Sequence, residues 1–415
     1  MRGPLNIILE DYDVSPVHGF LPHELPLQGL NSYYDDWEEA VRVLPANFAR
    51  KTYRSKLDKL TVLSTSRLHT KGEWQRAYVL LTFMTHGYIW GGELPAEILP
   101  PCISIPILVV AERLGIPPTA TAASLCLYNF KTSAPDLLTQ PESLTTLHTF
   151  TGTRDEEWFY LVSTAIEARG APIIPTMLKA MDAVRADNAS VVTRSLQEFI
   201  VCVSDINALI ERMYEECKPE VFYHEIRPAL AGSKNMAAAG LLRGVFYDEG
   251  YGKGEWRQYS GGSNAQSSTI QFLDLVLGIR HFPTKIPGEE PREKDSFHKE
   301  MRDYMPGGHR RFLEIIQQVA NIREYAQACA LGEEITIAYN DAVISLSKLR
   351  DNHIRLVTRY IVMPARKSSA NAMTGGLNLA VVSSGKNDVL SGTGGTQLIP
   401  FLKQSRDETK GTAIN

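Results

Sequence analysis

Cysteine is scarce in this chain and follows no recognisable spacing. Of 415 residues only five are cysteine: Cys102, Cys126, Cys202, Cys217 and Cys329. The odd count and the lack of any C-x-x-C pair exclude a disulfide framework and a zinc ribbon, and they favour a reducing, cytoplasmic setting. The ten histidines include no H-E-x-x-H pair, so the common zinc-protease motif is absent as well.

Long apolar runs are also missing. The nearest candidate, PCISIPILVVAERLG, is interrupted by Pro106 and by Glu112-Arg113, whereas a membrane-spanning helix needs roughly 18 apolar residues in a row. The first residues, MRGPLNIILEDYDVSP, turn acidic before any apolar core builds up, which is not the pattern of a signal peptide. We therefore expect a protein without a membrane segment.

The charge balance excludes one further class. The net charge is −4 and the isoelectric point is about 6.2, whereas a general nucleic-acid binder is expected to be basic. Apolar residues make up 44% and charged residues 22% of the chain, close to the average of globular proteins. A chain of this length can form two or three domains and bury a large core.

The apolar residues recur mostly at helical spacing. In the clearest case Val192, Leu196, Phe199, Val203 and Ile206 follow one another at three or four residues. This pattern predicts helices over 37–49, 73–89, 119–129, 155–169, 189–217, 263–281, 296–304, 308–331 and 336–362. Few alternating runs occur, so we predict an all-α, mostly helical fold.

Turn-rich segments divide these helices. Residues 131–150 are polar, and they suggest a boundary between a smaller N-terminal domain, 1–150, and a large helical domain, 151–415. Seven glycines within 240–262 predict a long loop between helices. Serine, glycine, asparagine and threonine dominate 365–397, which predicts a mobile loop near 365–395.

His353 lies on the apolar stripe of the last long helix, together with Leu346, Leu349 and Leu356. A histidine in this position is most often a core residue that is hydrogen-bonded to a neighbour. It could instead be the single axial ligand of a haem iron, which also needs an apolar environment. Spacing alone does not decide between the two interpretations.

Two charged residues stand in similarly apolar surroundings. Arg227, in YHEIRPALAG, would either pair with an acid of its own protein or hold the carboxylate of a ligand in a bidentate fork. Asp274, in QFLDLVLG, needs a partner to be buried, and arginine is the usual one. In both cases a structural ion pair is the simpler explanation.

Glycine-rich stretches offer further candidates. Gly261 and Gly262 would allow a ligand to approach the backbone closely, and Ser263 could cap the helix that follows. The segment SGTGGT, 391–396, lacks the Walker A spacing and is either a flexible tail or a lid over an anionic group. GYGKGEW, 250–256, has no strand–helix context and is not interpreted as a dinucleotide site.

Five longer stretches resemble the indoleamine 2,3-dioxygenase family, and the resemblance extends from about residue 73 to 403. They are PTMLKAMDAV (175–184), GGSNAQSSTIQFLDLVLGI (261–279), MRDYMPGGHRRFL (301–313), LRDNHIRLVTRYIVMPA (349–365) and GTGGTQLIPFLK (392–403). Several long matches in the same order are far more specific than any short motif. They favour the functional interpretation of each residue above.

The resemblance implies a large helical domain, a smaller N-terminal domain and one haem b between them. It implies an oxidoreductase that uses O₂ and ferrous haem to open the indole ring of L-tryptophan, giving N-formylkynurenine on the route to NAD. We expect a cytoplasmic monomer. An unidentified reductant would keep the iron ferrous. No nucleic acid or membrane is implied as a partner.

The resemblance also assigns roles to individual residues. His353 would be the iron ligand, and Arg350, paired with Asp274, would reach a haem propionate. Arg227 would bind the tryptophan carboxylate, with Ser163 and Phe222 beside the reacting groups. Gly262 and Ser263 would also face the haem. The remaining residues that face the substrate would be Phe159, Ala122, Cys126, Leu230, Gly261 and Thr393.

One helix departs from the family pattern. In TATAASLCLYNFK, Ala122 stands where family pockets commonly carry an aromatic residue, and Leu125 and Cys126 also differ in size. A roomier pocket forfeits dispersion contacts with the indole, so we expect weaker tryptophan affinity. An oxygen-binding or haem-sensing protein with little turnover is therefore the alternative, although it would not need a carboxylate clamp such as Arg227. A signalling scaffold is a third, weaker alternative, since most of the 17 tyrosines fall in helical segments.

Overall fold

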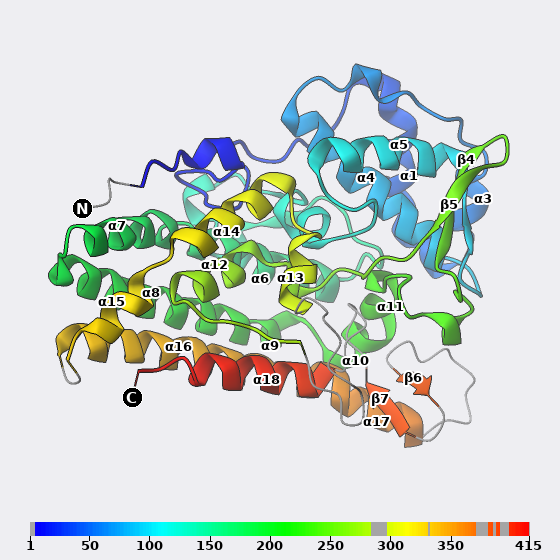
Figure 1. The fold of residues 1–415 in the computed structure, drawn as a ribbon. Helices are drawn as coiled ribbons and strands as arrows, with labels where there is room; N and C mark the ends of the chain where they lie inside the picture. Colours follow the sequence, from blue (N-terminus) through cyan, green and yellow to red (C-terminus); the bar gives the residue numbers. More distant parts are fainter. Residues whose placement is uncertain are drawn as a thin grey trace.

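The computed structural model describes residues 5–283, 297–330, 333–370, 381–384, 387–390 and 398–414. The described part is mostly helical, as predicted (Figure 1). None of its helices has the length and apolar character needed to cross a membrane.

The first part of the chain is built around one apolar helix, α4. Its N-terminus carries a capping box, in which Thr70 accepts from the backbone N–H of Glu73 and the Glu73 carboxylate accepts from that of Thr70. Nearly every side chain of α4 from Gln75 to Gly87 is buried, because neighbouring helices cover it on several sides. The helices of this part are α1 (Asp35–Arg42), α2 (Leu44–Ala49), α3 (Tyr53–Leu57), α4 (Lys71–Trp90) and α5 (Pro101–Leu114).

The second part contains the longest helices, which lie side by side in layers (Figure 1). Helix α16 packs along α8 on one side and along the C-terminal α18 on the other. A second hydrophobic core lies among α7, α8, α12, α14 and α16. The helices are α6 (Arg154–Gly170), α7 (Ile173–Arg185), α8 (Ala189–Glu211), α9 (Met213–Glu216), α10 (Pro219–Val221), α11 (Arg227–Leu230), α12 (Ser268–Val276), α13 (Phe297–Arg302), α14 (Gly307–Val319), α15 (Ile322–Ala328), α16 (Glu334–Val357), α17 (Met363–Ala370) and α18 (Leu398–Lys410).

The long glycine-rich loop predicted over 240–262 is wrong in its central part. Strands β4 (Val245–Gly250) and β5 (Lys253–Arg257) form an antiparallel hairpin, and β1 (Ile98–Leu99) joins β4 in parallel. Gly250 and Gly252 adopt positive φ of 80° and 74°, so the glycines of GYGKGEW serve the hairpin turn. Short pairs β2 (Phe130–Lys131) with β3 (Thr145–Thr146), and β6 (Val381–Ser384) with β7 (Asn387–Leu390), complete the strands of the described chain.

Several predicted helices differ in their bounds. The helix expected over 37–49 is divided at Val43, after which α2 begins at Leu44 with Pro45 in its first turn. The helix expected over 119–129 is only a π-helical turn, Ala123–Leu127, and Ser263 caps a short 3₁₀ turn while Ser267 caps α12. Two further π-helical turns, Phe222–Ile226 and Thr358–Val362, occur in the described chain.

The division into domains at residue 150 stays a prediction. The first hydrophobic core contains the N-terminal helices but also Ile226, Leu230 and Tyr247 from much later in the chain. Within the loop predicted near 365–395, the described residues form the end of α17 and the hairpin of β6 and β7. Thr393 lies outside the described residues.

Candidate active site

A cavity of about 240 Å³ lies where the hydrophobic clusters of the two parts meet. Its walls come from α6, α12, α16, α18 and the three π-helical turns. The lining is predominantly apolar, with few charged side chains. Eleven of the residues singled out in the sequence line it: Ala122, Cys126, Phe159, Ser163, Phe222, Arg227, Leu230, Gly262, Ser263, Arg350 and His353.

His353 faces the cavity from the last turns of α16. No hydrogen bond or ion pair engages its imidazole within the described chain, so the interpretation as a hydrogen-bonded core histidine has no support there. Burial lowers the pKa of His353 to about 4, and the nearby charge of Arg350 acts in the same direction. The ring is therefore neutral near pH 7, which is the form that can ligate a metal.

Arg350 lies one turn before His353, and the predicted pair with Asp274 is present. Arg350 Nη2 lies 2.5 Å from Oδ1 and 2.6 Å from Oδ2 of Asp274. Although burial works against the charge of Asp274, Arg350 and His281 hold its pKa well below the usual range. Asp274 itself does not line the cavity; it acts on the cavity through Arg350.

One buried nitrogen of Arg350 makes no hydrogen bond within the described chain. Its Nε is buried and has no hydrogen-bond partner among the described residues. A buried donor of this kind normally has a partner, so an acceptor on a ligand in the cavity would satisfy it.

Arg227 is only 4% exposed and begins α11, directly after the π-helical turn Phe222–Ile226. Burial lowers its pKa to about 10, and the guanidinium stays charged. Phe159 and Phe222 flank the same side of the cavity, with ring centroids 5.0 Å apart. A buried positive charge beside two aromatic rings is suited to a ligand that joins an aromatic group to a carboxylate.

The segment after β5 brings the backbone close to the cavity. A Cβ at Gly262 would lie 2.5 Å from Leu125 Cδ1, so a side chain at this position would require the Leu125 side chain to move. Gly261 does not line the cavity; its backbone packs tightly on Leu230 and Gly232. Ser263 lines the cavity while its hydroxyl accepts from the N–H of Ala265.

Ala122 and Cys126 lie on one wall with Ser163. The Ser163 hydroxyl donates to Phe159 O at 3.1 Å, and burial raises the pKa of Cys126 to about 12, so this thiol is inert. Among the described residues, Glu167, further along α6, is the one charged group on this wall. Ala122 leaves the wall without the aromatic ring that the family pattern suggests.

Several residues of the site could not be recognised from the sequence pattern. Glu167 lines the cavity, accepts from Ser267 and from both Thr269 N and Oγ1, and has a pKa raised by burial. Leu398, Phe401, Leu402 and Ser405 of α18 close one side, and His298 of α13 also lines it. Their places depend on how distant helices pack, although LIPFLK belongs to one of the stretches that carry the resemblance.

The residues present fit a haem. The apolar cavity matches the macrocycle, and His353, which is neutral and has no partner among the described residues, matches the iron. Arg350, with its unsatisfied Nε, matches an acidic propionate. His298 also lines the cavity, but its Nε2 already bonds Ser405 Oγ at 3.0 Å. His353 is thus the better placed candidate for the iron.

Comparison with known proteins agrees with this site. The family model "Indoleamine 2,3-dioxygenase" matches residues 8–412. An indoleamine 2,3-dioxygenase of Penicillium citrinum is 43% identical over 99% of this chain and 89% of its own length, and that of Saccharomyces cerevisiae is 40% identical over 98% and 94%. A 6-hydroxytryptophan 2,3-dioxygenase of Fusarium equiseti is 36% identical over 96% of both chains. The chain therefore belongs to the indoleamine 2,3-dioxygenase family of oxidoreductases.

Proposed function

We propose that this chain binds one haem b in the cavity and uses O₂ to open the indole ring of L-tryptophan, or of a ring-substituted tryptophan, giving the N-formylkynurenine product. The observation that carries the proposal is that His353 and Arg227 line the same apolar cavity. The first supplies a free imidazole and the second a buried positive charge.

When bound, the haem supplies the ferrous iron at which O₂ is activated for insertion into the indole C2–C3 bond. His353 would hold the iron, and Arg350 would place its unsatisfied Nε toward a propionate. Asp274 keeps the Arg350 guanidinium in this orientation through two short contacts. Such outer partners are typically worth 10–100-fold in the affinity of a bound metal.

Arg227 would receive the carboxylate of the substrate, since a guanidinium fork matches a carboxylate and the pair is favoured in a dry cavity. Phe159 and Phe222 would pack on the indole and restrict its orientation. Specificity then rests on shape together with the charge pair.

Proton abstraction by the protein has little support. Glu167 is the one carboxylate among the described residues that line the cavity, and three donors already engage it. A carboxylate satisfied in this way makes a poor general base. The role of the protein is thus to bind, orient and exclude water, while the cofactor supplies the chemistry.

The choice between tryptophan and a substituted tryptophan depends on the wall formed by Ala122 and Cys126. Alanine at position 122 leaves space in which a substituent on the indole would fit. The relative from Fusarium equiseti is named a 6-hydroxytryptophan 2,3-dioxygenase, so the family includes an enzyme for such a substrate. We keep both substrates in the proposal.

The test uses haem-reconstituted, reduced protein in air-saturated buffer, with L-tryptophan and 6-hydroxytryptophan in separate reactions. Formation of the ring-opened product, followed by absorbance and identified by mass, supports the proposal, and the ratio of kcat/KM decides the substrate. A protein that binds haem but yields no product with either substrate would support the alternative of an oxygen-binding or haem-sensing protein.

A further inference from the structure

Four largely buried charged side chains form a chain of alternating sign that begins at Arg350 in the cavity wall and leads away from it. Arg350 contacts Asp274, Asp274 Oδ2 lies 3.1 Å from His281 Nε2, and His281 Nδ1 lies 2.7 Å from Glu408 Oε2. They come from α16, α12, the segment after α12 and α18. The side chains are between 4% and 14% exposed.

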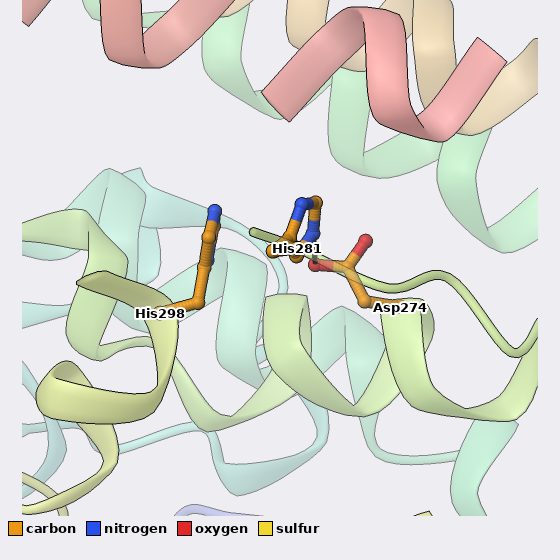
Figure 2. Close-up of side chains that lie close together, drawn as sticks. All are labelled: Asp274, His281 and His298. Carbon is orange, nitrogen blue, oxygen red and sulfur yellow. Dashed lines mark hydrogen bonds and ion pairs between the residues drawn. The ribbon is translucent and has the colours of Figure 1, made fainter. Parts of the chain in front are cut away.

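The contacts of His281 define its protonation. Each ring nitrogen faces a carboxylate oxygen, and a carboxylate can only accept. Arg350 Nη2 also lies 3.3 Å from His281 Nε2, but its two hydrogens go to the two oxygens of Asp274, at 2.5 and 2.6 Å. Both ring nitrogens of His281 therefore donate. His281 is therefore an imidazolium between two carboxylates. His298 lies beside this ring (Figure 2) and stacks on it, and the two ring centroids are 3.9 Å apart.

The same residues hold α18 in place. Glu408 also accepts from Gln404 Nε2 and from the N–H of Phe282, and Ser405 bonds His298. One turn earlier, α18 supplies Phe401 and Leu402 to the cavity wall. Anything that fixes Glu408 and Ser405 thus fixes one side of the cavity.

We propose that His281 is a positioning residue whose imidazolium, held between Asp274 and Glu408, fixes both the Arg350 guanidinium and helix α18 against the cavity. This inference rests on the proposed haem site. Without the positive charge, Asp274 and Glu408 would be left as two carboxylates with one cation, Arg350, at only one end of the chain. Arg350 would then be held less firmly and α18 would detach more often.

A metal ion is the competing explanation for this cluster. One ligand atom each from Asp274, His281 and His298 lie within 4.8 Å of one another. However, the Arg350 guanidinium already occupies both oxygens of Asp274, and both nitrogens of His281 face carboxylates. A metal ion would have to displace these contacts to reach its ligands, so the arrangement favours the imidazolium.

The charged and titratable groups that face His281 are Asp274, Glu408, Arg350 and His298. Burial works against the charge of His281, but Asp274 and Glu408 outweigh it, so the pKa of His281 is raised. The pKa values of Asp274 and Glu408 are lowered, chiefly by Arg350 and His281 respectively against the effect of burial. Burial lowers the pKa of His298 far below its ordinary value. Above pH 6, His281 is thus the group of the cluster that titrates.

The experiment compares the haem-loaded wild type with His281→Gln, with the double variant His281→Gln/Glu408→Gln, and with His224→Gln. The last is the matched control, because His224 is an exposed histidine 3.6 Å from Glu220. Haem transfer to excess apomyoglobin is followed by absorbance from pH 6 to pH 9. Hydrogen exchange over residues 398–410 is measured on the full-length chain without haem.

We expect His281→Gln to lose haem about 10–100-fold faster than the wild type at pH 6, as is typical for outer partners of a metal site. The rate of haem loss from the double variant should lie closer to that of the wild type, because the second substitution removes the excess negative charge at Glu408. Haem loss from the wild type should accelerate as pH rises, and that from His281→Gln should show less pH dependence. Helix α18 should exchange faster in His281→Gln, and His224→Gln should match the wild type.

Unchanged haem loss and unchanged exchange of α18 in His281→Gln would overturn the proposal. So would stoichiometric Zn²⁺ binding by the wild-type chain that is lost in His281→Gln. If the wild type takes up no haem at all, the proposed function fails, and the exchange of α18 still tests the role of His281. If His281→Gln does not fold, the double variant provides the comparison with the wild type.

Discussion

Replacement of Arg227 by alanine should raise the KM for L-tryptophan about 100-fold and leave the haem content unchanged. The magnitude follows from the burial of the guanidinium. The fall of its pKa to about 10 corresponds to ~3 kcal/mol, because one pKa unit is about 1.4 kcal/mol. A bound carboxylate would offset a cost of this size, and ~3 kcal/mol is about 100-fold in affinity.

The assay compares L-tryptophan with tryptamine, which has the same indole but no carboxylate. The ratio of kcat/KM for the two should fall toward one in Arg227→Ala, since only L-tryptophan loses an interaction. The ratio for Arg227→Lys should lie between those of the wild type and Arg227→Ala, because lysine keeps the charge but not the bidentate fork. Arg243→Ala is the control, as Arg243 is exposed and lies over Trp256, away from the cavity lining.

Two results would refute this reasoning. A KM for L-tryptophan within threefold of the wild type in Arg227→Ala would mean that another group binds the carboxylate. Loss of haem in the same variant would mean that Arg227 has a structural role. Soret absorbance of the purified variant separates the second result from the first.

Three more outcomes are expected. His353→Ala should lose the Soret band after reconstitution, because the free imidazole of the cavity is gone; an unchanged spectrum would exclude His353 as the iron ligand. Ala122→Phe should lower the KM for L-tryptophan and reduce kcat/KM for 6-hydroxytryptophan by about tenfold or more, since small steric changes in an apolar pocket are worth ~1–3 kcal/mol; equal kinetics would place Ala122 away from the substrate. Asp274→Asn should lower the free energy of unfolding by ~3–5 kcal/mol at pH 7, because it leaves Arg350 without its buried partner. The folded-state pKa of Asp274 is lowered, so its contribution to the free energy of unfolding is complete above about pH 4 and is lost as pH falls further. In denaturant titrations, the difference in the free energy of unfolding between wild type and Asp274→Asn should therefore be smaller at pH 3 than at pH 7. An equal difference at both pH values would contradict the ion pair of Asp274 with Arg350.

The helices and most of the cavity could be predicted from the sequence. Helical periodicity gave α4, α6 and α8 within a few residues, because buried stripes repeat at the helical period. The hairpin of β4 and β5 was missed, since its glycines mask the alternation of Val245, Tyr247 and the residues between them. The strand that pairs with the other edge of β4, β1, lies almost 150 residues earlier in the chain.

The cluster around His281 could not be found in the same way. His281, His298 and Glu408 have no fixed spacing, and they meet only because α18 returns along α16. Position 353 was different, because the apolar stripe of α16 and the family resemblance both pointed to it. Local patterns identify residues that belong to one element, whereas contacts between distant elements need the folded chain.

In the three π-helical turns of the described chain, the number of residues determines where the side chains of the site lie. Cys126, Phe222 and Tyr360 each lie within such a turn and each line the cavity. A π-helical turn holds one residue more than an α-helical turn, and such turns often mark functional sites. Deletion of one residue from Phe222–Ile226 would restore an α-helix and rotate the preceding residues relative to Arg227 by about 100°. In this turn a substitution leaves the positions of the neighbouring residues unchanged, whereas an insertion or deletion of one residue would move Phe222 relative to Arg227.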